Sequence, residues 1–374
     1  MTLPGELTDI VIDFCHEDEP SLLACSLVCK PWGSRSRYHL LRTNRLIHAQ
    51  NASTFQDLLI SPHCTFLPHL FALDVVVAPL PATGDETKWL DDLWKTLNSL
   101  PDLSLQKLHL GDVSVDLLPK LRLSTHAAAS LKSLHLECCD GRGKTTSSNI
   151  TLRVCDYLNT FEALQELSFE YSSAGRRISF IPPSPRDLEG IPRLRLPHLR
   201  RMTLSSAYRV FLPLFSQPGF IECPSLTHFD LQLPISVDEG TLQKFLDVVC
   251  APRVEVLKVS FRYMFRHVEG FFPAINLANF RSLRSVVFEL GEVTHSHEPS
   301  ARNADIRAGV PFILQQMRGV DPKKTQITFV TQFSFAPLTG LSVDVQWVEV
   351  ERTTTGDGKT GDAGEGVSGT SRYQ

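Results

Sequence analysis

A short apolar motif that recurs through most of the chain constrains its fold more than any other feature. The motif has the form L-x-x-L-x-L, in which Val, Met or Phe replaces some of the leucines. Eight copies start 26 to 35 residues apart. They are Leu70–Val75, Leu105–Leu110, Leu131–Leu136, Leu164–Phe169, Leu199–Leu204, Leu226–Leu231, Val254–Val259 and Leu283–Phe288.

The spacing inside the motif predicts a short strand whose fourth and sixth residues point into a core. A loop or helix must then return the chain to the next strand, which favours parallel pairing. One such repeat cannot bury its apolar face alone, so neighbouring copies are expected to stack on one another. The sequence therefore predicts an α/β fold in which short parallel strands form an irregular solenoid over residues 49–352.

The recurring motif resembles the leucine-rich repeat, whose copies run about 20 to 29 residues and share this leading pattern. Insertions on one face would explain the longer spacings. That repeat family usually has Asn or Cys three residues after the last apolar position, and Cys139 alone meets this condition here. The alternative is a compact α/β domain whose strands share the pattern by chance.

The first fifty residues have the pattern of three short helices. Pro4 can start the first, Pro20 the second and Pro31 the third. A unit of about 45 residues is too small to bury all of its apolar side chains. Some of them must form a patch that a partner, or the rest of the chain, covers. Four of the apolar residues form one stripe at helical spacing: Leu7, Ile10, Val11 and Phe14.

Residues 2–42 resemble an F-box. The resemblance rests on Leu3-Pro4-x-Glu6-Leu7-x-x-Ile10 and on Leu27-Val28-Cys29-Lys30-x-Trp32. It implies docking on a Skp-type adaptor, which joins F-box proteins to a cullin-based ubiquitin ligase. The residues that it implies at the adaptor surface, or directly behind it, are Leu3, Pro4, Glu6, Leu7, Ile10, Leu22, Leu27, Val28 and Trp32. The alternative is a helical cap on the repeat array.

Outward positions of the strands are expected to form a polar face. This face mixes acidic, basic and His side chains, which would suit a polar protein ligand and equally an ordinary solvated surface. Six candidates for binding a target protein lie on it: His109, His135, Glu137, Arg201, Asp230 and Lys258.

Composition and charge exclude several function classes. The chain has 37 basic and 41 acidic residues, a net charge of −4, which argues against a nucleic-acid partner. Its apolar runs are too short to span a bilayer, and Met1–Glu6 show no secretory signal, so no membrane partner is expected. The nine irregularly spaced cysteines indicate reduced thiols in the cytoplasm or nucleus.

Chemical motifs are incomplete, so we expect a protein that is not an enzyme and has no catalytic residues, metal or cofactor. Gly143-Lys144-Thr145 could end a phosphate loop, but Cys138 stands where the first glycine belongs. A nucleotide site at Lys144 is the enzymatic alternative. His295-x-His297-Glu298 and Cys25-x-x-x-Cys29 lack a second ligand pair at metal spacing.

The chain is expected to divide into F-box helices at 1–48, the solenoid at 49–352 and a tail at 353–374. Residues 326–335 and 341–350 alternate in polarity and predict a closing hairpin. In the tail, 13 of 22 residues are Gly, Ser or Thr, which predicts disorder. The predicted function is the substrate-recognition subunit of an SCF-type ubiquitin ligase; the alternative is an interaction module with no link to the ligase.

Overall fold

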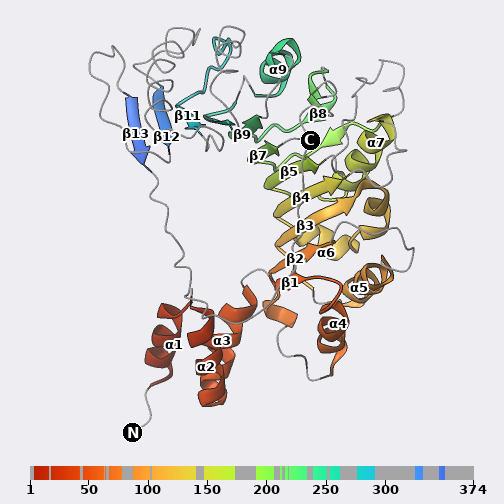
Figure 1. The fold of residues 1–374 in the computed structure, drawn as a ribbon, viewed down its shortest axis with the longest axis vertical. Coiled ribbons are helices and arrows are strands. Elements are labelled where there is room, and N and C mark those ends of the chain that lie inside the picture. Colours follow the sequence, from red (N-terminus) through yellow and green to blue (C-terminus); the bar gives the residue numbers. More distant parts are fainter. Residues whose placement is uncertain are drawn as a thin grey trace, which may run out of the picture.

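A long parallel sheet with helices along one side dominates the computed structural model of the protein (Figure 1). Three helices precede the sheet and lie beside its first strand. The structure describes residues 4–16, 18–42, 45–62, 64, 67–77, 87–101, 103–139, 147–172, 191–205, 211–212, 215–217, 219–233, 239–250, 253–261, 276–290, 325–331 and 345–349. Leu3, the segment around Lys144, residues 295–298 and the tail at 353–374 lie outside this part.

The first three helices occur where the sequence predicts them. They are α1 (Gly5–Phe14), α2 (Glu19–Val28) and α3 (Lys30–Arg42). The Asp18 carboxylate caps α2 by accepting from the backbone N–H of Ser21, and Pro20 lies in its first turn. The three helices share a core of Ile12, Leu22 and Leu40.

In the described part of the chain, eleven strands form the main sheet, and they follow one another in chain order (Figure 1). Every neighbouring pair is parallel. The strands are β1 (Arg45–Ile47), β2 (Ala72–Val76), β3 (Lys107–Ser114), β4 (Ser133–Cys139), β5 (Glu166–Ser172), β7 (Arg201–Ser205), β9 (His228–Leu233), β10 (Val256–Phe261), β11 (Ser285–Leu290), β12 (Gln326–Thr331) and β13 (Val345–Glu349). A separate small sheet pairs β6 (Leu194–Arg195) with β8 (Ile221–Glu222).

Each of the eight motif copies forms one strand, which begins two residues after the first residue of the motif. The first, fourth and sixth residues of every copy are at most 8% exposed. The predicted α/β class and the inward positions are therefore confirmed. Most of these buried side chains belong to one continuous core that runs along the sheet.

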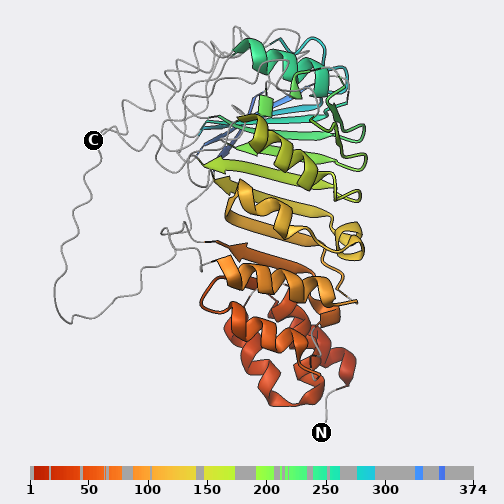
Figure 2. The same ribbon diagram turned by 90° about the vertical axis from the view of Figure 1, so that its right-hand side faces the viewer.

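We call the strands and helices from β1 onwards the array. Its described helices line one side of the main sheet in both views (Figures 1 and 2). Among them, α5 packs Leu90, Leu93, Trp94 and Leu97 into the core, and the Trp94 indole donates to the carbonyl of Leu121 at 2.5 Å. The α-helices are α4 (Ala52–Ile60), α5 (Lys88–Ser99), α6 (Thr125–Ser130), α7 (Ser147–Leu158) and α9 (Glu239–Phe245). Shorter helical turns are η1 (Leu67–His69), η3 (Val115–Leu121) and η5 (Leu246–Cys250).

Side-chain amides tie each of three helical segments to the loop of the next repeat. The Asn98 amide donates to the carbonyl of Arg122 at 3.0 Å, and its oxygen accepts from the N–H of Ser124 at 2.6 Å. Two further amides make the same pair of bonds: Asn159 with Arg193 and Arg195, and Gln243 with Asn276. These bonds satisfy backbone groups that no strand or helix pairs.

Two expectations about the ends of the sheet are wrong. The last strands, β12 and β13, do not form a hairpin, because they pair in parallel. Residues 332–344 separate them, which is long enough for the crossover that a parallel pair requires. The main sheet also begins earlier than expected, since β1 lies within the predicted helical range 1–48 and pairs with β2.

Loss of the Asn98 amide should weaken the stacking of repeats. We expect Asn98→Ala to lower the free energy of unfolding by about 1 kcal/mol, because two backbone bonds lose their partner at a solvated site. Asn98→Asp keeps the acceptor for Ser124 and loses the donor to Arg122, so its effect should be smaller. Urea denaturation measures both, and an unchanged midpoint in Asn98→Ala would show that water replaces the amide without cost.

Candidate functional site

An exposed apolar surface on α1 and α2 is the first candidate site. We call it the helical apolar surface and define it by seven side chains that are 45 to 86% exposed. They are Leu7, Ile10, Val11, Phe14, Leu23, Leu27 and Val28. Phe14 and Leu27 are the most exposed, at 84% and 86%. Large apolar side chains grouped in this way are typical of surfaces that bind another protein.

The small size of the helical core explains why these side chains stay outside. Both α1 and α2 pack on α3, and the shared core holds few buried side chains beyond Ile12, Leu22 and Leu40. The helices join the array through α3, where the Tyr38 ring lies 5.8 Å from that of His69 and 6.5 Å from that of Phe71. The expected excess of apolar side chains is therefore present, and no described segment of the array covers it.

The residues that the F-box resemblance implies have different environments. Six of them are exposed: Pro4, Glu6, Leu7, Ile10, Leu27 and Val28. Trp32 is half-buried against the helical core. Leu22 is 1% exposed, so it supports the surface from inside and cannot contact a partner. The exposed Phe14 and Leu23 were missing from the predicted set, although their helical spacing places them beside residues that it contained.

A charged pair fixes α1 against α3 behind the helical apolar surface. The Arg35 guanidinium donates two hydrogen bonds to the Asp13 carboxylate, at 2.6 and 2.7 Å. The His39 Nε2 atom lies 2.6 Å from Asp13 Oδ1. Hydrogen bonds from Arg35 and His39 hold the pKa of Asp13 well below its usual range. This two-bond geometry orients α1 as well as holding it.

The outward face of the main sheet is the second candidate site. The strands pair in register, so equivalent positions of successive repeats form one row across the sheet. The row runs through Asp74, His109, His135, Ser168, Thr203, Asp230 and Lys258. Of the six predicted target-binding residues, four belong to this row and Glu137 flanks it, and these five fall into two clusters. Arg201 is separate, because it is exposed at the start of β7 beside Glu166 and His228.

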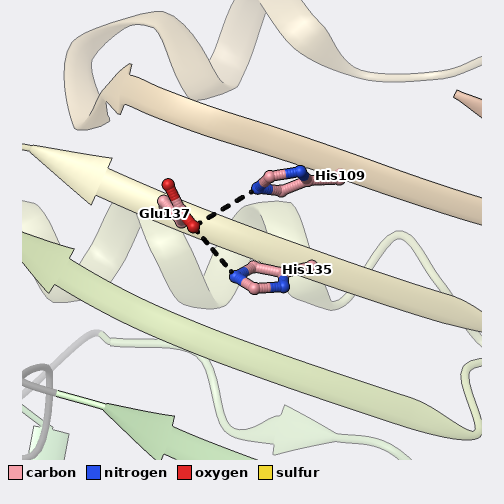
Figure 3. A group of neighbouring side chains, drawn as sticks. All are labelled: His109, His135 and Glu137. Carbon is pink, nitrogen blue, oxygen red and sulfur yellow. Dashed lines mark ion pairs between the residues drawn. The ribbon is translucent and has the colours of Figure 1, made fainter. Parts of the chain in front are cut away.

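The first cluster combines His109 of β3 with His135 and Glu137 of β4 (Figure 3). Glu137 Oε1 lies 3.4 Å from His109 Nε2 and 3.2 Å from His135 Nε2. The two imidazole centroids are 4.4 Å apart. Asp74 of β2 approaches from the other side, with Oδ1 2.8 Å from His109 Nδ1. Sequence reasoning selected the first three residues separately and missed Asp74.

Partial burial disfavours the charged form of the second imidazole. Loss of water contact, and the neighbouring His109, lower the pKa of His135, although the surrounding carboxylates oppose the shift. Its deprotonated ring nitrogen can accept a hydrogen bond or bind a metal ion.

The second cluster is an ion-pair group on β9, β10 and β11. Lys258 Nζ lies 2.8 Å from Glu289 Oε2 and 3.7 Å from Asp230 Oδ2. The Ser260 hydroxyl donates to the same Glu289 oxygen at 2.7 Å. Burial raises the pKa of Asp230, and the Lys258 charge opposes that rise. Lys258 and Ser260 therefore pair with the Glu289 carboxylate, whereas Asp230 Oδ1 is buried without a hydrogen-bond partner. The lysine charge within the group makes it a weaker candidate for binding a cation than the His cluster.

No protein-family model matches the chain, and no curated protein is significantly similar to it. In the described part of the chain, no helix is long and apolar enough to cross a lipid bilayer.

Removal of the Asp13 charge should loosen α1 from α3. We expect Asp13→Asn to speed amide hydrogen exchange in α1 about three- to tenfold at neutral pH, because a charge-assisted pair is lost. Asp9→Asn makes the same charge change one turn earlier and is the control.

The pH dependence of this contact follows from the lowered pKa of Asp13. The stabilisation is complete above the ordinary carboxyl pKa of about 4 and declines as the pH falls further below it. The protein should therefore lose this protection in acid and keep it in mild base. Equal exchange rates in Asp13→Asn and Asp9→Asn would show that the pair does not hold the helix.

Proposed function

We propose that the protein is the substrate-recognition subunit of an SCF-type ubiquitin ligase that works in the cytoplasm or nucleus. In this proposal the helices α1–α3 dock on a Skp-type adaptor and through it on a cullin. The strands and helices that follow act as an irregular leucine-rich-repeat-like solenoid that holds a target protein. The observation that carries the proposal is the helical apolar surface, in the segment that resembles an F-box.

Burial of that surface would supply the binding energy. Removal of apolar area from water contributes about 25 cal/mol per Å², and a few well-packed anchors usually dominate a protein interface. The α1 side chains at positions i, i+3, i+4 and i+7 have the spacing of a helix that docks in an apolar groove. Leu7, Ile10 and Leu27 are exposed enough to be such anchors without disturbing the core.

The proposed mechanism is proximity and needs no covalent chemistry from this chain. A target bound on the outward face of the sheet would bring its lysines near a charged ubiquitin carrier. The resulting local concentration would raise the rate of transfer without any catalytic residue in the receptor. Stacked repeats suit this task, because their outward positions form an extended surface along the sheet.

The second candidate is an interaction module in which the helices only cap the array. The contact of Tyr38 with His69 and Phe71 favours it, since α3 does cover one end of the array. A cap needs only the α3 side of the helical unit. It gives no reason for the apolar side chains of α1 and α2 to remain exposed.

Adaptor binding distinguishes the two candidates. We expect the full chain to co-purify with a Skp-type adaptor, and Leu7→Asp, Ile10→Asp and Leu27→Asp each to weaken binding about tenfold or more, because a charge would enter an apolar interface. Leu58→Asp and Ile60→Asp are matched controls, since these α4 side chains are 51% and 62% exposed outside the helical apolar surface. Calorimetry with purified adaptor measures the affinities.

The two outcomes have different meanings. Loss of binding only in the α1 and α2 variants would support the receptor. Absence of adaptor binding by the correctly folded chain would leave the interaction module as the function.

A further inference from the structure

We propose that His109, His135 and Glu137 form a binding site for one zinc ion on the outward face of the main sheet. The three side chains come from two adjacent strands and converge on one point (Figure 3). One ligand atom from each lies within 4.8 Å of the other two. This proposal does not depend on the ligase function, since the site stands apart from α1–α3.

The distances between the ligand atoms fit a tetrahedral zinc ion. Zinc bonds to imidazole nitrogen or carboxylate oxygen are about 2.0–2.1 Å long, so two tetrahedral ligand atoms stand roughly 3.3–3.4 Å apart. Glu137 Oε1 lies 3.4 Å from His109 Nε2 and 3.2 Å from His135 Nε2. Two of the three distances between ligand atoms are therefore close to those expected around a tetrahedral zinc ion.

The two imidazoles lack the hydrogen bonds that would otherwise explain their positions. His109 Nε2 and His135 Nε2 are both buried, and neither has a hydrogen-bond partner. Their contacts with Glu137 are close in distance but do not have hydrogen-bond geometry. Buried polar atoms without a partner are uncommon, and an absent ion is one of their ordinary explanations. A zinc ion would satisfy both nitrogens at once.

A second carboxylate lies beside one of the ligands. Asp74 Oδ1 lies 2.8 Å from His109 Nδ1, which leaves Nε2 as the nitrogen that faces the site. Metal-binding His residues usually have a carboxylate or carbonyl beside the ring nitrogen that faces away from the metal. Asp74 and Glu137 would also offset the charge of a divalent cation.

A glycine lies directly beside the ligand atoms. Gly111 of β3 has no side chain, and a Cβ atom there would lie 3.6 Å from both His109 Nε2 and Glu137 Oε2. The pairing of β3 with β4 is interrupted between Leu110 and Val113, and Asp112 has a φ of 54°. Three protein ligands and an open position are the pattern of zinc sites that bind water or another ligand.

The donor set favours zinc or a neighbouring transition metal over calcium and magnesium. Two imidazole nitrogens and one carboxylate oxygen suit zinc and its transition-metal neighbours, whereas calcium and magnesium prefer sites made of oxygen alone.

Zinc titration of the metal-free full chain tests the site. We expect one zinc ion per chain by calorimetry, and at least tenfold weaker binding in His109→Gln, His135→Gln and Glu137→Gln. Asp74→Asn should weaken binding about 10- to 100-fold, because it removes only the carboxylate beside His109. His228→Gln, which changes a half-buried His at an outward position of β9, should bind zinc as the unaltered chain does.

Two controls keep the result unambiguous. His135→Gln is the decisive variant if others fold poorly, since the His135 side chain is the most exposed of the three ligands, at 42%. Cobalt(II) in place of zinc should show tetrahedral absorption without a thiolate charge-transfer band, which distinguishes this site from the nine cysteines. Absence of zinc binding, or an affinity that none of the three ligand variants reduces, would overturn the proposal.

Discussion

In-register parallel pairing is the constraint on which the rest of the structure depends. The carbonyl of the second motif residue accepts from two backbone N–H groups of the next repeat, as Gln106 does from Lys132 and Ser133 at 2.9 Å. The same arrangement recurs at Lys132, Gln165, Arg200, Thr227 and Glu255. Because the register repeats in this way, equivalent residues of successive repeats lie side by side. Inward positions then form the core, and outward positions form rows of polar side chains.

The sequence predicts the strands well because their signal is local. Three apolar residues at fixed spacing, such as Leu131, Leu134 and Leu136, define both the strand and the side that it buries. Pairing direction is not local, since alternation in β12 and β13 fits a hairpin and a parallel pair equally well. The three-residue strand β1 carries no motif of its own. Its place in the sheet depends on pairing with β2, and such a pairing between distant residues cannot be read from the sequence of β1.

The candidate site shows the same division between local and distant signals. Metal motifs are usually recognised by ligands a few residues apart, and the two histidines His109 and His135 are 26 residues apart. They are nevertheless partners in the sheet, because that spacing equals one repeat. The side-chain amides that bridge repeats were missed for a related reason. Asn98 and Asn159 perform that bridging at the ends of helices, not at the position after the strand where the leucine-rich pattern places an Asn.

Helix α3 connects the helical apolar surface with the start of the main sheet. One of its sides carries Arg35 and His39, which hold α1 through Asp13. Its Tyr38 ring packs on the start of the array, with the Arg35 guanidinium 4.9 Å from the ring centroid. The same short segment therefore orients the helical apolar surface and contacts the array. In the proposed receptor, these contacts would fix the adaptor-binding surface relative to the target-binding surface, which a proximity mechanism needs.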